Sequence, residues 1–217
     1  MDKIPLFPLN TVLFPGMPVM LHIFEPRYQQ MIRECLEENE PFGVVLIKNG
    51  HEADGPLAEP HLVGCSARIM QAKNLTNGRM KIVAIGEQRF EVQALDHELE
   101  YLRADVEFYA MDIDDDALVQ ASGDHLRPLV KRYLDILNQA NVVTGALNSL
   151  PDNPLDLTNL AAFLLQIPSE QKQDLLNLDL ATEFIDDTLG IYLKEVALLK
   201  NLLEIDKHST PKTASLN

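Results

Sequence analysis

Ser169 and Lys172 are separated by two residues, which is the S-x-x-K spacing of a serine nucleophile beside a lysine. The S-D-N and K-T-G sequences that complete such a site in penicillin-binding proteins do not occur in this chain. Ser169 also follows Pro168, and a serine at the start of a helix commonly caps its first turn. We therefore predict that Ser169 caps a helix, and we assign no catalytic residue.

The histidines and cysteines are the other residues that could do chemistry, as metal ligands. The six histidines and two cysteines form no H-x-x-H or C-x-x-C pair, so folding alone would have to bring ligands together. The phosphate-binding sequence G-x-x-x-x-G-K-[ST] is also absent. We therefore expect no metal site and no cofactor.

Cys35 and Cys65 are expected to be core thiols. Cys35 falls on the apolar side of a predicted helix, and Cys65 follows Gly64 in a predicted strand. The sequence does not give their separation in space, so a disulfide between them stays an open alternative. So few cysteines favour a reducing compartment, and no leader-like or membrane-length apolar run is present, so we expect the cytoplasm.

Four charged residues lie in apolar, β-rich sequence: Glu25, Arg27, Arg68 and Arg89. One interpretation is a polar functional site, because perturbed ionisable groups are common at such sites. The other is an internal network of ion pairs and helix caps that holds the strands to a helix. We favour the structural network.

Phe14, Met17 and Met20 are the residues that we predict to contact a polypeptide. They surround the Pro15-Gly16 turn, and exposed methionine or phenylalanine at a turn can adapt to varied apolar ligands. Burial in a barrel core is the competing interpretation, particularly for Met20.

A β-rich first half, predicted over residues 1–110, must position these side chains. Residues 4–28 indicate a strand, a type II turn at Pro15-Gly16, a second strand and a helix that starts at Pro26. The prolines should keep both strands short, bent or at an edge. Further strands are predicted at 43–47, 63–70, 79–85, 89–95 and 101–109, with a hairpin at Asn77-Gly78 and a turn at 86–88.

The second half, residues 111–206, is predicted to be an α-helical bundle. Its apolar periodicity indicates helices up to about Gln139, over 157–166, from Ser169 to Leu176 and over 180–203, with a break or kink at Gly123 and Pro128. Residues 207–217 are predicted to be a flexible polar tail. Short strands at regular spacing favour a barrel, so the fold class is α+β, a barrel of about six strands and one helix followed by the bundle.

The chain is strongly acidic, with 33 Asp and Glu against 18 Lys and Arg and a formal net charge of −15. Such a charge repels phosphate backbones and makes nonspecific nucleic-acid binding an unfavourable hypothesis.

Several stretches together resemble the Lon N-terminal, substrate-binding domain family. The resemblance runs from about residue 3 to about residue 205, in the order that the family uses. It rests on P-L-F-P-L at 5–9, L-F-P-G at 13–16, L-H-I-F-E-P-R-Y at 21–28, F-G-V-V at 42–45, V-G-C-S-A at 63–67, N-G-R at 77–79, L-P at 150–151, L-Q-I-P at 165–168 and K-Q-D-L-L at 172–176.

The resemblance implies a PUA-like β-barrel with a helical subdomain, and a module that recognises unfolded polypeptides. Separate ATPase and Ser–Lys protease domains do the work in full-length Lon proteases, so we expect a stand-alone, non-enzymatic binding module without them. Its expected partners are unfolded or apolar segments, and a separate protease or chaperone that takes them over. Two alternatives stay open, namely RNA binding by a PUA-like barrel and a small-ligand or enzymatic site between the subdomains.

Overall fold

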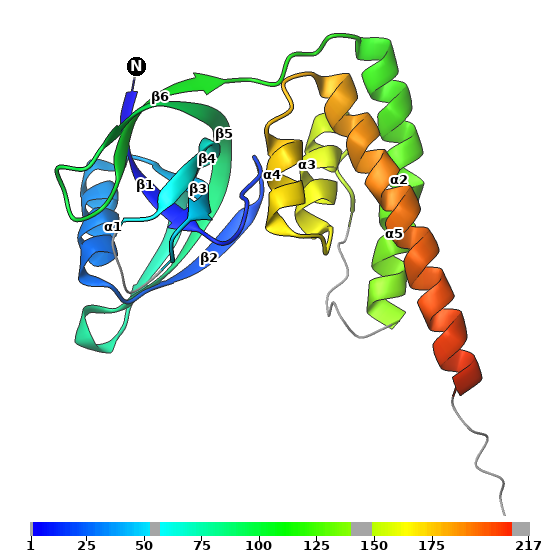
Figure 1. Cartoon of the computed structure of the whole chain (residues 1–217), viewed down its shortest axis with the longest axis horizontal. Coiled ribbons are helices and arrows are strands. Elements are labelled where there is room, and N and C mark those ends of the chain that lie inside the picture. The colour runs from blue at the N-terminus through cyan, green and yellow to red at the C-terminus, as the bar shows by residue number, and fades with distance from the viewer. Residues whose placement is uncertain (1, 53–56, 140–148, 210–217) are drawn as a thin grey trace, which may run out of the picture. The chain divides into compact units, whose positions relative to one another are not determined.

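The computed structural model describes residues 2–52, 57–139 and 149–209, with side chains up to residue 201 (Figure 1). By their contacts the residues divide into two compact units, one of 1–112 with 159–180 and one of 113–158 with 181–217. The boundary at residue 110 stays a prediction, although residues 159–180 group with the strands. The predicted tail from residue 207 lies mostly outside the described residues.

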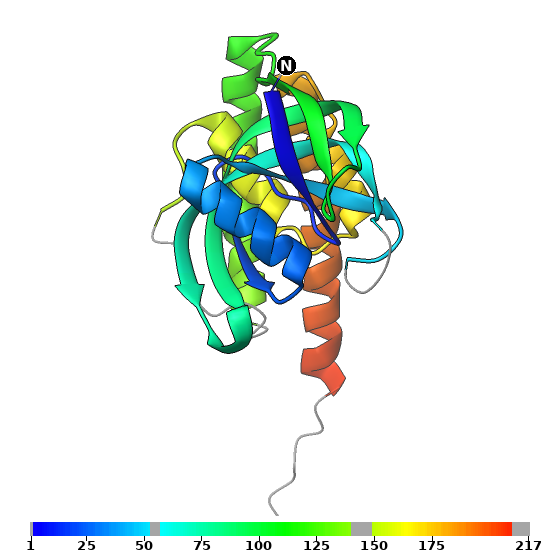
Figure 2. The ribbon, with the colours of Figure 1, turned by 90° about the vertical axis from the view of Figure 1, so that its left-hand side faces the viewer.

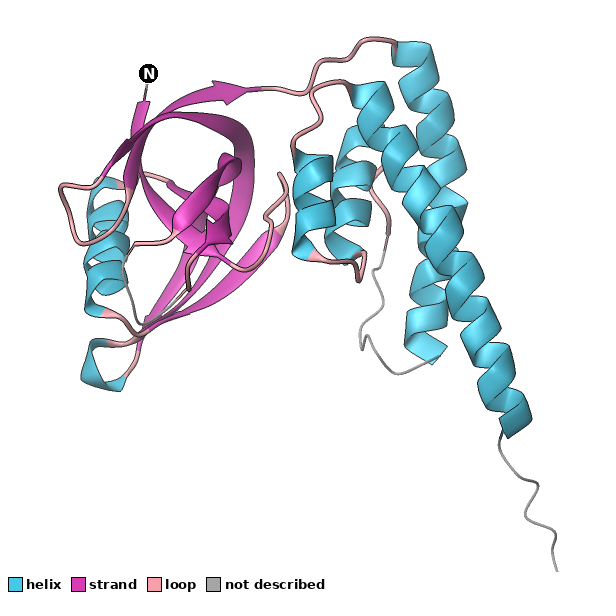
Figure 3. Cartoon of the chain, viewed as in Figure 1, coloured by secondary structure: helices cyan, strands magenta, loops and turns pink. Residues whose placement is uncertain are grey.

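The strands of the first unit form one sheet with the order β2-β5-β4-β3-β1-β6, and an additional β5–β6 pairing closes it into a barrel. Figure 3 shows these strands in magenta. This confirms the predicted α+β class and the barrel of six strands. The strands are β1 (Asp2–Leu9), β2 (Pro18–Ile23), β3 (Phe42–Asn49), β4 (Glu59–Asn74), β5 (Met80–Asp96) and β6 (Arg103–Tyr109).

β5 is a single long strand that serves two partners. Its first part, Met80–Ile85, pairs with β2, and its second part, from Arg89 onwards, pairs with β6. The predicted turn at 86–88 is therefore wrong. The strand continues through Gly86 without reversing, and this position requires glycine because a Cβ there would lie 2.5 Å from the carbonyl oxygen of Phe14.

β1 tolerates its prolines because each half pairs along a different edge. Asp2–Pro5 pair with β6, and Leu6–Leu9 pair with β3. Proline removes only one amide donor, so a strand segment that pairs with a single neighbour loses few of its inter-strand hydrogen bonds. β1 is thus not a sheet edge, and it does not form a hairpin with β2, which lies at the other end of the sheet order.

Two turns follow the sequence pattern closely. The amide of Met17 donates to the carbonyl of Phe14 at 3.1 Å, and Gly16 has φ of +77°, as a type II turn requires. The β4–β5 loop has positive φ at both Asn77 and Gly78, which confirms the predicted hairpin.

Helix α1 (Pro26–Glu38) begins at a proline and lies across the outside of the barrel (Figure 2). It buries the apolar stripe Tyr28, Met31, Ile32 and Cys35. The ring of Tyr28 stacks on Phe7 of β1 with 4.2 Å between centroids.

The second unit is helical, as predicted. α2 (Asp116–Gln139) runs through Pro128 without a break, and α5 (Ala181–Ser209) packs along it. Asp115 caps α2 by accepting the amide of Leu118 at 3.0 Å, and Asp114 accepts the amide of Thr182 in the first turn of α5 at 3.1 Å. The remaining helices are α3 (Pro154–Leu164) and α4 (Ser169–Leu176).

Within the part of the chain that is described, every helix falls short of the length or apolar character that crossing a membrane requires.

Candidate functional site

The side chains of Ser169 and Lys172 donate hydrogen bonds to backbone carbonyls and are not arranged as a catalytic pair. The Ser169 hydroxyl donates to the carbonyl oxygen of Asn10 at 2.8 Å, and Lys172 Nζ donates to that of Phe163 at 2.8 Å. The predicted capping role is wrong, because Pro168 is the N-cap of α4 and no side chain caps it. Burial lowers the pKa of Lys172.

Arg89 and Gln173 make the same kind of contact nearby. Arg89 is 3% exposed, and its Nη1 donates to the carbonyl oxygen of Leu178 at 2.6 Å. Burial lowers the pKa of Arg89. Gln173 Nε2 donates to the carbonyl oxygen of Val63 at 3.1 Å. We call this region the α4 seat (Asn10, Val63, Arg89, Ser169, Gln173 and Leu178).

The other predicted network residues lie at the two ends of α1. Arg68 pairs with Glu87 at 2.5 Å and donates through Nη1 to the carbonyl of Asn39, the C-cap of α1, at 2.9 Å. Arg27 pairs with Glu25 at 2.8 Å. Arg27, Arg68 and Arg89 thus have different partners in different parts of the unit. Arg68 and Arg89 bind backbone carbonyls, and Arg27 pairs with Glu25 at the start of α1. A structural role for them stays our interpretation.

Both cysteines are free and buried, which answers the open question of a disulfide. Burial raises the thiol pKa of each from 9.0 to about 12. Among the residues that the structure describes, no group of three or more His, Cys, Asp or Glu side chains is placed to hold a metal ion.

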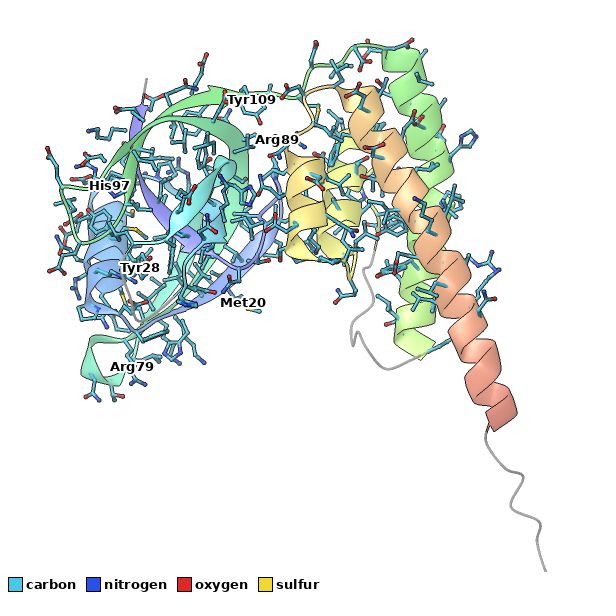
Figure 4. The ribbon with its side chains drawn as sticks, viewed as in Figure 1. Met20, Tyr28, Arg79, Arg89, His97 and Tyr109 are labelled. Atoms are coloured by element: carbon cyan, nitrogen blue, oxygen red, sulfur yellow. The ribbon has the colours of Figure 1, made fainter. Side chains whose placement is uncertain are left out.

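The three predicted binding residues are in different surroundings. Phe14 is fully buried and Met17 is 8% exposed, so the expectation that their side chains face a partner is wrong. Their turn folds against β5, where Gly16 donates to the Gly86 carbonyl at 2.8 Å and Gly86 donates to the Met17 carbonyl at 2.9 Å. Met20, by contrast, is 81% exposed on β2 (Figure 4).

β2 is an edge strand. Among the described residues it pairs with β5 alone, so its outer edge has no strand beside it. Such an edge presents unpaired N–H and C=O groups that can pair with another chain. Met20 on β2 and Phe24 just after it are exposed apolar residues, the latter at 47%, and a further one, Met70 at 61%, lies in a bulge of β4 on the other side of β5.

Two grooves flank β2. The hairpin groove, of about 480 Å³, crosses β2, β5 and β4, and its lining includes Met20, His22, Gln71, Lys73, Lys81 and Val83. The edge groove, of about 360 Å³, follows the outer edge of β2, and its lining includes Phe7, Met20, Phe24, Glu25, Tyr28 and Glu52. Met20 lines both, and we call β2 with these grooves the β2 edge site.

A larger groove of about 890 Å³ lies in the second unit, between α2 and residues 149–152. Its lining is mostly polar and charged, and Arg127 there already donates to the carbonyl of Pro151 at 2.7 Å. The β2 edge site is therefore the better candidate.

Comparison with known proteins identifies the domain. The sequence profile of the ATP-dependent protease La (LON) substrate-binding domain matches residues 3–189. The Lon protease of Anaeromyxobacter dehalogenans is 27% identical over 175 residues, covering 80% of this chain and 21% of that protein. Lon protease 1 of Hydrogenovibrio crunogenus is 25% identical over 208 residues, covering 94% and 25%. The chain therefore spans about a fifth to a quarter of these relatives.

Solved structures show the same fold. The Lon N-terminal domain protein from Xanthomonas campestris superposes with a TM-score of 0.61 at 24% identity, covering 88% of this chain and 98% of that one. The N-terminal domain of Mycobacterium avium complex Lon protease gives a TM-score of 0.60 at 19% identity, covering 90% and 98%. With the profile match over most of its length, the chain belongs to the Lon substrate-binding domain family.

Proposed function

We propose that this chain is a non-enzymatic binding module that takes up extended, apolar polypeptide segments along β2. The observation that carries the proposal is the unpaired outer edge of β2 with the exposed Met20 on it, between two grooves. Membership of a substrate-binding domain family supports the class of ligand.

The mode of binding is strand addition. An extended segment hydrogen bonds to the free backbone groups of β2 and places alternate side chains against the grooves. Main-chain bonding suits many sequences, and the apolar lining adds a preference for apolar residues. A flexible segment loses conformational entropy on binding, so we expect a dissociation constant on the order of 10⁻⁵ M.

The test is fluorescence anisotropy with a labelled peptide of about ten residues, the length of a long strand, in which apolar residues alternate with glutamine. The native chain is expected to bind it saturably. Met20→Ser is expected to weaken binding at least about tenfold, because an exposed anchor that becomes buried on binding is worth more than about 1.4 kcal/mol. Leu193→Ser is the matched control, since Leu193 is 52% exposed on α5.

Peptides with N-methyl groups separate strand addition from mere apolar adhesion. Methylating every second amide removes the donors on one edge of an extended peptide, and methylating the others removes those on the opposite edge. One set is expected to abolish binding and the other to leave it largely intact. Equal affinity of both sets, or equal affinity of Met20→Ser and native chains, would contradict the proposal.

A further inference from the structure

The charge around the β2 edge site differs from that of the rest of this acidic chain. No Asp or Glu occurs between Asp2 and Glu25, or between Glu59 and Glu87. These two intervals contain β2, nearly all of β4 and the part of β5 that pairs with β2. The stretches of β2, β5 and β4 that line the hairpin groove thus contain no acidic residue, although the net charge of the chain is −15.

The strand register arranges the side chains of the hairpin groove in two rows. Met20, Val83 and Gln71 are opposite one another across the three strands and form one row, which we call the apolar row because its two members nearest the edge, Met20 and Val83, are apolar. His22, Lys81 and Lys73 form the next row. Because residues two apart on a strand share a face, both rows lie on one face, about 7 Å apart. A basic row therefore lies beside the apolar row that ends at Met20.

The lysines of the basic row are available to a ligand. Lys73 and Lys81 are both exposed, and neither forms an ion pair within the part of the chain that the structure describes. Arg79, in the adjoining loop, is exposed as well.

The edge groove has the opposite charge. Glu25 and Glu52 line it, the first paired with Arg27 at 2.8 Å and the second accepting the amide of Asn10's side chain at 2.9 Å. Acidic side chains of a bound segment are thus attracted to the lysines of the hairpin groove, whereas the described residues that line the edge groove include no lysine or arginine.

We propose that the β2 edge site selects polypeptide segments that carry an acidic residue two positions from an apolar one. This rests on the proposed function, because it presumes strand addition to β2. A strand beside β2 continues both rows, so an apolar residue next to Met20 places the residue two positions away next to His22, within reach of Lys81. A shift of the acidic residue by one position turns it to the other face.

Four labelled peptides of the same length test this selection. One carries glutamine at the polar positions, one glutamate two positions from the apolar anchor, one glutamate shifted by one position, and one lysine. At about 50 mM NaCl the in-register glutamate peptide is expected to bind about two- to fivefold tighter than the glutamine peptide, as one exposed ion pair with Lys81 allows. The advantage is expected to vanish at about 500 mM NaCl. The shifted glutamate and lysine peptides are expected to gain nothing.

Protein variants locate the effect. The double variant Lys73→Gln, Lys81→Gln is expected to lose the glutamate preference, so that its affinities for the in-register glutamate peptide and the glutamine peptide become equal. Lys194→Gln, an exposed lysine on α5, is the matched control and is expected to keep the preference. Thermal unfolding of each variant confirms that folding is intact.

The outcomes distinguish the two levels of the proposal. Equal affinity for the glutamate and glutamine peptides overturns the acidic selection and leaves strand addition standing. Absence of binding by all four peptides overturns both. A labelled single-stranded RNA of about ten nucleotides that binds tighter than the glutamate peptide, and that the double lysine variant no longer binds, assigns the basic row to nucleic acid and overturns the acidic polypeptide.

Discussion

The α4 seat and the β2 edge site both adjoin the barrel and differ in whether their backbone groups already have hydrogen-bond partners. At the α4 seat, the carbonyl groups of Asn10, Val63 and Leu178 each accept a hydrogen bond from a side chain. At β2, the outer edge has no strand beside it among the described residues. We therefore interpret the polar side chains of the α4 seat as structural, and the surface that we propose for a partner is an edge of backbone with apolar neighbours.

The largest expected effect is at Gly86, where β5 passes from the closed part of the barrel to β2. In Gly86→Ala the new Cβ would lie 2.5 Å from the Phe14 carbonyl oxygen, a backbone atom that cannot move without its turn. We expect the free energy of unfolding to fall by about 3 kcal/mol in chemical denaturation.

Gly190→Ala is the matched control. Nothing lies within 4 Å of a Cβ at Gly190, which is inside α5. This substitution is expected to stabilise the chain by about 0.5 to 1 kcal/mol. If the two substitutions changed the free energy of unfolding equally, the close contact between position 86 and the Phe14 carbonyl would not be the reason that this position requires glycine.

A smaller loss of unfolding free energy is expected when the hydrogen bond of Arg89 in the α4 seat is removed. Arg89→Met removes the donor to the Leu178 carbonyl, so this partly buried carbonyl loses its charge-assisted hydrogen bond. We expect a loss of about 2 kcal/mol in unfolding free energy. Arg33→Met, at an exposed position of α1, is expected to change stability by less than about 0.5 kcal/mol. The folded Arg89→Met chain should bind the glutamine peptide normally, and a loss of binding there would break the distinction between the two regions.

The buried thiols predict a pH dependence of the closed barrel. The folded pKa of Cys65 and of Cys35 is raised from 9.0 to about 12, so the folded state retains protons that the unfolded state loses. The resulting stability is present below about pH 9 and is lost as the pH rises toward 12. Between about pH 8 and pH 10 each thiol is expected to lower the unfolding free energy by about 1.4 kcal/mol.

Cys65→Ala and Cys35→Ala check this separately. Each is expected to reduce the fall in stability between these pH values by about half of the contribution from the two thiols. An unchanged pH profile in both variants would show that the thiols do not titrate as their burial requires.

The smallest effect on stability is expected at Met20. Met20→Ser removes an apolar side chain that is already 81% exposed, so the unfolding free energy should change by less than about 0.5 kcal/mol. Thermal unfolding measures this. A loss above about 1.5 kcal/mol would mean that Met20 packs as a structural residue and that its exposure does not mark a binding surface.

Local sequence signals predicted most elements because their physical causes are local. Pro26 at a helix start, Gly16 with positive φ and Asn77-Gly78 in a hairpin loop act within a few residues of themselves. The turn at 86–88 was wrong for a non-local reason. Position 86 requires glycine because the Phe14 carbonyl, from a distant segment of the chain, approaches it closely. The sequence around residues 86–88 contains no sign of this contact.

The candidate site was predicted only in part for the same reason. Met20 was proposed together with Phe14 and Met17, because all three are apolar and adjoin one turn. The exposure of these three side chains depends on which strand pairs with β2. That strand is the first part of β5, whose second part pairs with β6. The sequence did contain one usable signal, the two acid-free intervals that meet in space at the β2 edge site.

Strand addition at β2 is tested most directly by mapping backbone amide shifts by NMR while the native chain is titrated with the glutamine peptide. The largest changes in shift, with slowed hydrogen exchange, are expected at residues 19–24 and along the adjoining part of β5, and the shifts of the amides of the α4 seat are expected to stay unchanged. Changes centred on Ser169–Leu178, or on α2 and α5, with β2 unaffected, would contradict it.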